Sequence, residues 1–224
     1  MNKANVIEAF QSFQGEGPDV GTRQFILRFK VCNRVRDKKG CAFCDTVLKM
    51  RISNEMEISF GEIQKVVNEN KTGLLISGGE PTSEENIQST IELINKVKCS
   101  LYNIETNGYN LPLLIEKVKK NKNVHYILSP KIFTEEDFRF YLGLIPKIQN
   151  NKNVYIKLVY EERELIIKFL DYLQEIEFSN DRIFLMPEGK DASSILSHAP
   201  MVFDVAEKYK VNFSSREHII YGFV

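Results

Sequence analysis

The chain has 224 residues and carries 30 basic and 30 acidic side chains, so its formal net charge at pH 7 is zero. Proteins that bind nucleic acid through its phosphates usually carry an excess of positive charge, so this balance disfavours a dedicated nucleic-acid binder. The hydrophobic content of 43% is typical of a folded globular protein rather than a disordered chain. No run approaches the roughly 18 apolar residues of a membrane span, and the N-terminal segment lacks the apolar stretch of a secretory signal. We therefore expect a cytoplasmic protein whose cysteines stay reduced.

Short apolar runs alternate with amphipathic patterns along the chain. The apolar runs predict strands at 24–31, 73–77, 101–105, 124–129, 154–160 and 182–186. The amphipathic patterns predict helices at 59–70, 83–97, 111–121, 135–148, 162–176 and 194–209, and the second of them is expected to begin at a Ser83 cap. Strand followed by helix, six times over, predicts an α/β fold in one domain, 1–224, with a parallel sheet or partial barrel.

The unusual residues of the sequence all follow predicted strands. Three cysteines follow the first strand, and the third and fourth strands precede ETNG and SPK. Gly78-Gly79-Glu80-Pro81 follows the second strand, and MPEGK overlaps the end of the sixth. In parallel α/β folds, ligands bind beyond the carboxyl ends of the strands, so we expect these segments to make one site.

Cys32, Cys41 and Cys44 have the spacing C-x8-C-x2-C. Three thiolates without an obvious fourth ligand suit either a zinc ion with an outside ligand or a [4Fe–4S] cluster with one open iron, and the spacing alone does not choose. Cys99 lies in a helical pattern and is expected to be a buried small hydrophobe. The inserted segment 33–40, NRVRDKKG, is basic; it is either a solvated turn or a docking patch for an acidic electron donor.

The segment Gly78-Gly79-Glu80-Pro81 lets the backbone approach a ligand closely, because glycine has no side chain. Glu80 would place a carboxylate there, which suits an ammonium group. By itself the segment could equally be a turn.

Taken together, these motifs resemble the radical S-adenosylmethionine (SAM) superfamily, and more narrowly the 7-carboxy-7-deazaguanine synthase family. The resemblance extends over nearly the whole chain. The motifs that carry it are FQSFQGEGP, the strand with Arg28, CAFCDT, SGGEP, ETNG, SPK, IKLV, LMPEG and HIIYG. The first cysteine gap departs from the superfamily's common C-x3-C-x2-C, and the basic character of 33–40 departs from the apolar insertion expected in the family.

The resemblance implies a partial (β/α)6-type radical SAM barrel and a carbon–nitrogen lyase of 7-deazapurine (queuosine) biosynthesis. The reaction would convert 6-carboxy-5,6,7,8-tetrahydropterin to 7-carboxy-7-deazaguanine with loss of ammonia. Cys32, Cys41 and Cys44 would hold a [4Fe–4S] cluster whose fourth iron binds SAM, and Thr46 would bind Mg²⁺. An electron donor such as a flavodoxin and a homodimer are also implied, and no side chain is expected to be catalytic because the radical forms on SAM.

The resemblance further implies two sets of binding residues. Arg28 would hold the substrate carboxylate, while Gln14 and Glu16 would bond the pterin edge. The full substrate set is Phe13, Gln14, Gly15, Glu16, Arg28 and Ser77. The full SAM set is Gly79, Glu80, Glu105, Asn107, Ser129, Pro130, Lys131, Met186, Pro187, Glu188 and Gly189.

Two other functions share some of these features. A radical SAM activase that installs a glycyl radical on a partner protein would also need the cysteines and GGEP, but not QGEGP. A zinc-binding module without enzymatic activity would need only the cysteines.

Overall fold

The computed structural model describes residues 2–41, 44, 47–160 and 164–223. The chain divides into two compact units. Unit 1 is built from Met1–Gln14 and Gly21–Tyr126, and unit 2 from Gly15–Val20 and Ile127–Phe223. The expectation that 1–224 is one functional domain stays a prediction.

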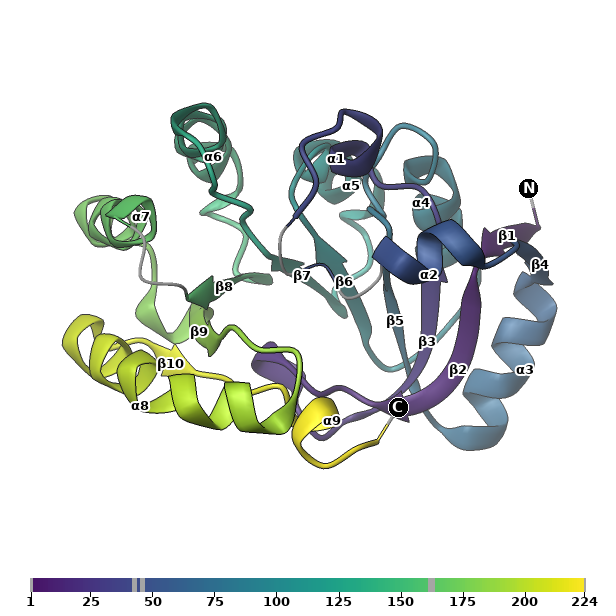
Figure 1. Cartoon of the computed structure of the whole chain (residues 1–224). Helices are drawn as coiled ribbons and strands as arrows, with labels where there is room; N and C mark the ends of the chain where they lie inside the picture. The colour runs from purple at the N-terminus through teal and green to yellow at the C-terminus, as the bar shows by residue number, and fades with distance from the viewer. Residues whose placement is uncertain (1, 42–43, 45–46, 161–163, 224) are drawn as a thin grey trace. The chain divides into compact units, whose positions relative to one another are not determined.

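Unit 1 contains a sheet with the strand order β2-β3-β5-β6 (Figure 1). The strand bounds are Glu8–Phe13 for β2, Arg23–Phe29 for β3, Gly73–Gly78 for β5 and Tyr102–Thr106 for β6. The pairs β3–β5 and β5–β6 are parallel, whereas β2 runs antiparallel to β3. The carboxyl ends of β3, β5 and β6 therefore share one edge.

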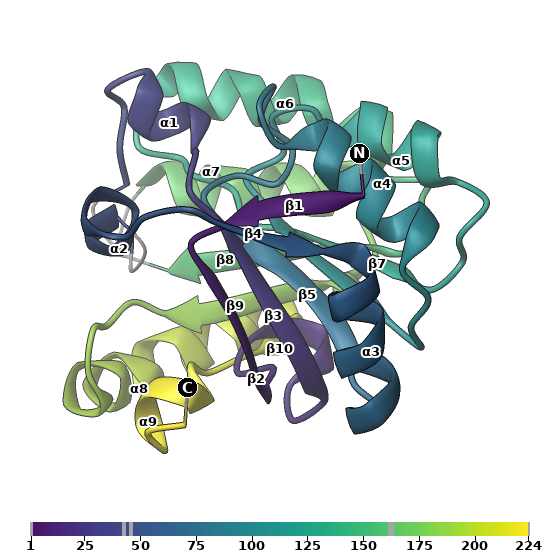
Figure 2. The ribbon, with the colours of Figure 1, turned by 90° about the vertical axis from the view of Figure 1, so that its right-hand side faces the viewer.

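A second, two-stranded antiparallel sheet joins β1 (Lys3–Val6) to β4 (Met56–Ser59), as Figure 2 shows. The helices of unit 1 are α1 (Asn33–Arg36), α2 (Val47–Ile52), α3 (Phe60–Asn70), α4 (Ile87–Lys96) and α5 (Leu111–Val118). Strand β7 (Val124–Leu128) carries the boundary between the two units.

Local sequence signals explain where the helices of unit 1 begin. The Ser59 hydroxyl accepts a bond from the Glu62 amide, and the Glu62 carboxylate accepts one from the Ser59 amide, so α3 begins with the predicted capping box. Helix α4 begins later than predicted, because 81–86 forms turns and Asn86, not Ser83, occupies the N-cap. The core of this unit buries the aliphatic side chains of the parallel strands, including Leu27, Ile76 and Ile104.

Unit 2 contains the parallel strands β8 (Val154–Tyr160), β9 (Ile183–Pro187) and β10 (Asn212–Phe213). Its helices are α6 (Glu135–Ile148), α7 (Glu164–Glu175), α8 (Ala192–Tyr209) and α9 (Glu217–Ile220), with short 3₁₀ turns at Gly17–Asp19 and Asn180–Arg182. Phe169 of α7 packs edge-on against Tyr141 of α6, and both rings are buried. This aromatic contact forms part of the core of unit 2.

The predicted α/β class with mostly parallel strands is confirmed. The sequence did not predict β1, β2 and β4, which pair antiparallel. Their residues are only partly apolar and partly exposed, so they lack the continuous apolar runs that marked the parallel strands. Within the described ranges, no helix is both long and apolar enough to cross a membrane.

Candidate functional site

The loop after β5 packs tightly on the segment that leads from β3 to the first cysteine. The Gly79 amide donates to the Phe29 carbonyl at 2.7 Å, and the Glu80 amide donates to the Val31 carbonyl at 2.8 Å. A Cβ atom on Gly79 would lie 2.1 Å from the Val31 carbonyl oxygen, a distance that no side chain can occupy. The close backbone approach that these glycines allow is thus an approach to the segment after β3 in the same chain, whereas the sequence predicted an approach to a ligand.

The Glu80 carboxylate joins the loops that follow β5 and β6. It is 2% exposed. Its Oε1 accepts bonds from the Thr82 amide, the Thr82 hydroxyl and the Thr106 hydroxyl, and its Oε2 accepts from the Asn107 amide at 2.6 Å. Burial raises the pKa of Glu80, and these bonds oppose the rise. Because both oxygens are already bonded inside the protein, the carboxylate itself fixes the loop geometry.

The inserted segment 33–40 is not only a loop, because it begins with helix α1. Asn33 is buried and accepts a bond from the Asn107 side chain at 2.8 Å. Arg34 is also buried and bonds the Gly40 carbonyl, and Arg36 pairs with Asp37, Glu84 and Glu85. Two of the segment's four cations therefore stabilise local structure, which weakens the idea of a purely electrostatic docking patch.

Cys32, Cys41 and Cys44 are all half-buried. The Cys44 amide donates to the Cys41 carbonyl at 3.2 Å, so the backbones of these two residues lie close together. Burial raises the pKa of Cys32 to about 11, so a bound metal would have to displace its proton. Three thiols in one segment match the donor type of an iron–sulfur cluster. In this structure the three described thiols do not stand close enough together to hold one metal ion.

No three His, Cys, Asp or Glu side chains in the described part of the chain stand close enough to hold a metal ion. Thr46, the predicted magnesium ligand, lies outside the described residues. Cys99 precedes β6 and so lies at the amino end of that strand, where its thiol donates to the Leu101 carbonyl. Cys99 thus lies beyond the end of α4 and is half-buried, so the expectation of a buried residue in a helix was wrong.

Residues predicted separately for substrate and for SAM meet at Glu105. The Gln14 side chain donates to Glu105 Oε1 at 3.3 Å, and the Ser77 hydroxyl donates to Oε2 at 3.1 Å. Arg28 lies opposite Ser77 in the strand register and forms an ion pair with Glu8 at 2.7 Å. Phe13, at the end of β2, is exposed. Unit 1 thus brings Gln14, Ser77 and Glu105 together.

In unit 2, Glu16 of the QGEGP motif is the centre of an ion cluster. Its Oε2 pairs with Lys157 Nζ at 2.5 Å and its Oε1 with Arg216 Nε at 2.9 Å, while His218 Nε2 lies 3.9 Å away. The Glu16, Lys157 and Arg216 side chains are 12%, 4% and 7% exposed. Burial opposes ionisation of Glu16, but the combined charges of its partners outweigh burial and hold its pKa well below the usual range.

No role was predicted for Lys157, Arg216 or His218. A signal for Lys157 was present, since it is the one charge in the apolar strand run VYIKLVY, and a buried lysine needs a partner. His218 also packs against Gly15, where a Cβ would lie 2.4 Å from its Nδ1. No comparable pattern marks Arg216.

The remaining predicted SAM residues lie in unit 2, at the end of β9 and in the loops that follow β7 and β9. Lys131 Nζ donates to the Ser129 hydroxyl at 2.8 Å, and the Lys131 amide donates to the Tyr141 hydroxyl. After β9, the Gly189 carbonyl accepts from Arg216 Nη1 at 2.7 Å. Pro130, Met186 and Pro187 are buried, and the Glu188 carbonyl is hydrogen-bonded to the His198 ring. The Arg216 bond links the loop after β9 to the Glu16 cluster.

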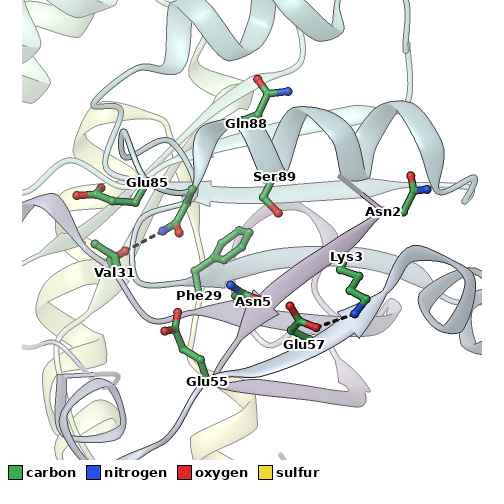
Figure 3. Close-up of a pocket in the computed structure, with 11 residues that line it drawn as sticks. Asn2, Lys3, Asn5, Phe29, Val31, Glu55, Glu57, Glu85, Gln88 and Ser89 are labelled. Atoms are coloured by element: carbon green, nitrogen blue, oxygen red, sulfur yellow. Dashed lines mark hydrogen bonds and ion pairs between the residues drawn. The ribbon is translucent and has the colours of Figure 1, made fainter.

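Unit 1 also holds a cavity of about 500 Å³, shown in Figure 3. It is bordered by β1, β4 and the start of α4, and its charged lining is mainly acidic. The lining residues are Asn2, Lys3, Asn5, Phe29, Val31, Glu55, Glu57, Glu85, Asn86, Gln88 and Ser89. The residues predicted to bind substrate or SAM are not among them.

Comparison with known proteins finds similar chains over the full length. Two of them are named 7-carboxy-7-deazaguanine synthase. The protein from Hyperthermus butylicus is 23% identical over 223 residues, covering 96% of this chain and 91% of the relative. The protein from Thermoplasma acidophilum is 26% identical over 226 residues, covering 97% of each. The chain is thus similar, over nearly its whole length, to proteins named 7-carboxy-7-deazaguanine synthase.

The synthase from Haemophilus influenzae is 34% identical over 105 residues, which cover 46% of this chain and 45% of the relative. No protein-family model matches the chain. Among solved structures, the fold is shared with QueE from Escherichia coli, with a TM-score of 0.63, 19% identity and coverage of 96% and 95% of the two chains. SuiB from Streptococcus suis, bound to precursor peptide SuiA, aligns with a TM-score of 0.58 and 18% identity over 89% of this chain and 50% of SuiB.

Proposed function

We propose that this chain is a 7-carboxy-7-deazaguanine synthase, a radical SAM lyase that converts 6-carboxy-5,6,7,8-tetrahydropterin to 7-carboxy-7-deazaguanine with loss of ammonia. The full-length relatives support this function. The observation that carries it is the meeting of Gln14, Ser77 and Glu105, because the sequence assigned the first two to substrate and the third to SAM. A reaction that begins on SAM and continues on substrate needs both binding sets in one place.

Cys32, Cys41 and Cys44 are the residues proposed to hold the [4Fe–4S] cluster. When bound, the cluster supplies the single electron that cleaves SAM. Thr46 is proposed to contribute a hydroxyl to Mg²⁺, which keeps much of its water shell. Glu80 acts through the loop that it fixes, because its carboxylate is bonded to Thr82, Thr106 and Asn107.

Arg28 is proposed to bind the substrate carboxylate by exchanging its bond to Glu8 for one to the ligand. The side chains of the pair are about three-quarters buried. The exchange would replace one charge-assisted hydrogen bond of Arg28 with another in the same partly desolvated place. The other substrate residues proposed are Phe13, Gln14, Gly15, Glu16 and Ser77. The SAM residues proposed are Gly79, Glu80, Glu105, Asn107, Ser129, Pro130, Lys131, Met186, Pro187, Glu188 and Gly189.

The wider setting of the proposal is a cytoplasmic homodimer that draws electrons from a flavodoxin-like donor and works in queuosine biosynthesis. Its test is anaerobic reconstitution with iron and sulfide, followed by incubation with carboxytetrahydropterin, SAM and a chemical reductant. A brown protein that forms 7-carboxy-7-deazaguanine supports the proposal. SAM cleavage without ring contraction would favour an activase, and a colourless protein that keeps zinc in air would favour a zinc module.

Two substitutions make the cluster assignment specific. Cys32→Ala should abolish uptake of a four-iron cluster, because too few thiolates remain. Cys99→Ala is the matched control, since its thiol bonds Leu101 at the other end of the sheet. Iron retained by Cys32→Ala and lost by Cys99→Ala would reject the assignment.

Arg28→Ala should raise the substrate dissociation constant by a factor of about 10 to 150, the loss of one charge-assisted hydrogen bond. SAM cleavage without substrate should persist, because Arg28 is not assigned to SAM. Glu8→Ala is the control: it removes the competing carboxylate and should leave substrate binding unchanged or tighter. Isothermal calorimetry on the reconstituted proteins measures both, and normal substrate binding by Arg28→Ala would remove Arg28 from the site.

A further inference from the structure

Helix α1 begins directly at the first cysteine. Cys32 is the N-cap of this helix, and its carbonyl accepts a bond from the Arg36 amide at 3.0 Å. The Asp37 amide closes the turn on the Asn33 carbonyl at 2.8 Å. The backbone of Cys32 is therefore fixed wherever α1 is fixed.

Asn33, the first residue of α1, connects this helix to the loops that follow the next two strands. Its side-chain oxygen accepts a bond from Asn107 Nδ2, and the Asn107 amide donates to Glu80 Oε2. All three residues are less than 8% exposed. A continuous, buried hydrogen-bonded path thus runs from the residue beside Cys32 to the GGEP and ETNG loops.

Two further contacts hold the same segment. The Val31 carbonyl accepts from Asn86 Nδ2 at 2.9 Å, the bond that ends at Val31 in Figure 3. On the outer side of α1, Arg36 reaches Glu85 at 2.9 Å and Glu84 at 3.3 Å. The Arg36 pairs are solvent-exposed, and exposed ion pairs contribute little. Asn33 is thus the buried side chain of α1 that bonds the loop after β6, whereas the buried Arg34 bonds Gly40 within the inserted segment itself.

We propose that Asn33 is a positioning residue that sets Cys32 relative to the SAM-binding loops, and that the insertion between Cys32 and Cys41 serves as the brace that carries it. The inference rests on the proposed radical SAM function. Asn33 bonds Asn107 rather than any bound group, so it acts through its neighbours. If the side-chain oxygen of Asn33 is removed, the buried Asn107 Nδ2 group that donates to it loses this acceptor. The GGEP and ETNG loops can then shift relative to Cys32.

The test compares wild type, Asn33→Ala and Arg36→Ala after anaerobic reconstitution with iron and sulfide. The readouts are iron content, the electron paramagnetic resonance spectrum of the reduced cluster with and without SAM, and the SAM dissociation constant. Asn33→Ala should keep its iron, because all three cysteines remain, but should change the spectrum and bind SAM about tenfold more weakly. Arg36→Ala, on the same helix, should stay within about twofold of wild type.

A double-mutant cycle with Asn107→Ala separates an effect of Asn33 on loop position from an effect on the stability of the whole protein. If Asn33 acts through Asn107, Asn33→Ala should have no further effect on SAM affinity in the Asn107→Ala background. A wild-type spectrum and SAM affinity in Asn33→Ala, whatever its melting temperature, would overturn this inference alone. A wild-type protein that takes up no iron would overturn the proposed function as well.

Discussion

Two buried glutamates, one in each unit, follow a glycine in similar motifs and yet meet opposite surroundings. Glu80 in SGGEP is surrounded by neutral donors, namely hydroxyls and backbone amides. Glu16 in QGEGP is held by two cationic side chains. Burial raises the pKa of Glu80, whereas the charges around Glu16 lower its pKa despite burial.

The difference shows that the same residue type can organise a site in two ways. Glu80 connects two loops and has no cationic partner, so the free-energy cost of burying its carboxylate is the loss of hydration. Glu16 completes a cluster whose formal charge, with Lys157 and Arg216, remains positive. Removing each carboxylate should therefore have consequences of different size and different pH dependence.

The largest effect is expected for Glu16→Ala. The substitution leaves Lys157 and Arg216 buried without their carboxylate, which should destabilise the protein by about 3–5 kcal/mol. Urea unfolding followed by circular dichroism measures the change. Glu164→Ala, which breaks the exposed pair with Lys168, is the matched control and should cost less than about 1 kcal/mol. Equal losses in the two variants would mean that the Glu16 cluster is not a buried ion network.

A smaller effect is expected for Glu80→Gln. The amide keeps the shape of the side chain, but its NH₂ group cannot accept hydrogen bonds. Some of the amide and hydroxyl donors that face Glu80 therefore lose their acceptor. The loss should be about 1–3 kcal/mol in the same unfolding experiment. Thr106→Val, which removes one of the donors to Glu80, should cost less than Glu80→Gln. A Glu80→Gln protein as stable as wild type would show that the carboxylate is protonated throughout.

The smallest effect is the change of stability with pH. A raised pKa in the folded state means that the contribution of Glu80 is complete below its unfolded pKa of about 4.3 and is lost as pH rises through the folded value. Wild type should therefore gain stability relative to Glu80→Gln when the pH falls from 7.5 to 5. A difference that does not change over this range would contradict the raised pKa.

Glu16 should show the opposite sign. Its lowered pKa means that its contribution is present above about pH 4.3 and is lost only as the pH falls toward the folded value. The stability difference between wild type and Glu16→Gln should thus stay constant from pH 7.5 to 5 and shrink below about pH 4. Loss of that difference already at pH 6 would contradict the lowered pKa of Glu16.

The parallel strands were predictable because burial on both faces produces continuous apolar runs. The run 154–160 matches β8 residue for residue, and the Ser59 capping box marks the start of α3. Antiparallel β2 was not predictable in this way, since none of its residues is buried and its sequence has no continuous apolar run. The start of α4 was placed too early because Ser83 resembled an N-cap, whereas the loop after Glu80 continues in turns as far as Asn86.

The site was partly predictable for a different reason. Motifs after strand ends must share an edge, so the meeting of Ser77 with Glu105 follows from strand order. The partners of Glu16 did not follow, because Lys157 and Arg216 come from distant parts of the chain and only the buried lysine leaves a pattern in the sequence. The bond of Asn33 to Asn107 was equally hidden, since two asparagines 74 positions apart carry no periodic signal.

The route of the chain through the two units has a consequence for synthesis. Residues Gly15–Val20 belong to unit 2, although the chain on both sides of them belongs to unit 1. Glu16 therefore leaves the ribosome 141 residues before Lys157 and 200 residues before Arg216. At about 5–20 residues per second, its carboxylate waits roughly 10 to 40 seconds for its last partner. During that interval nearly all of unit 1 has been synthesised and can fold. The ion cluster of unit 2 can form only after Arg216 has been synthesised.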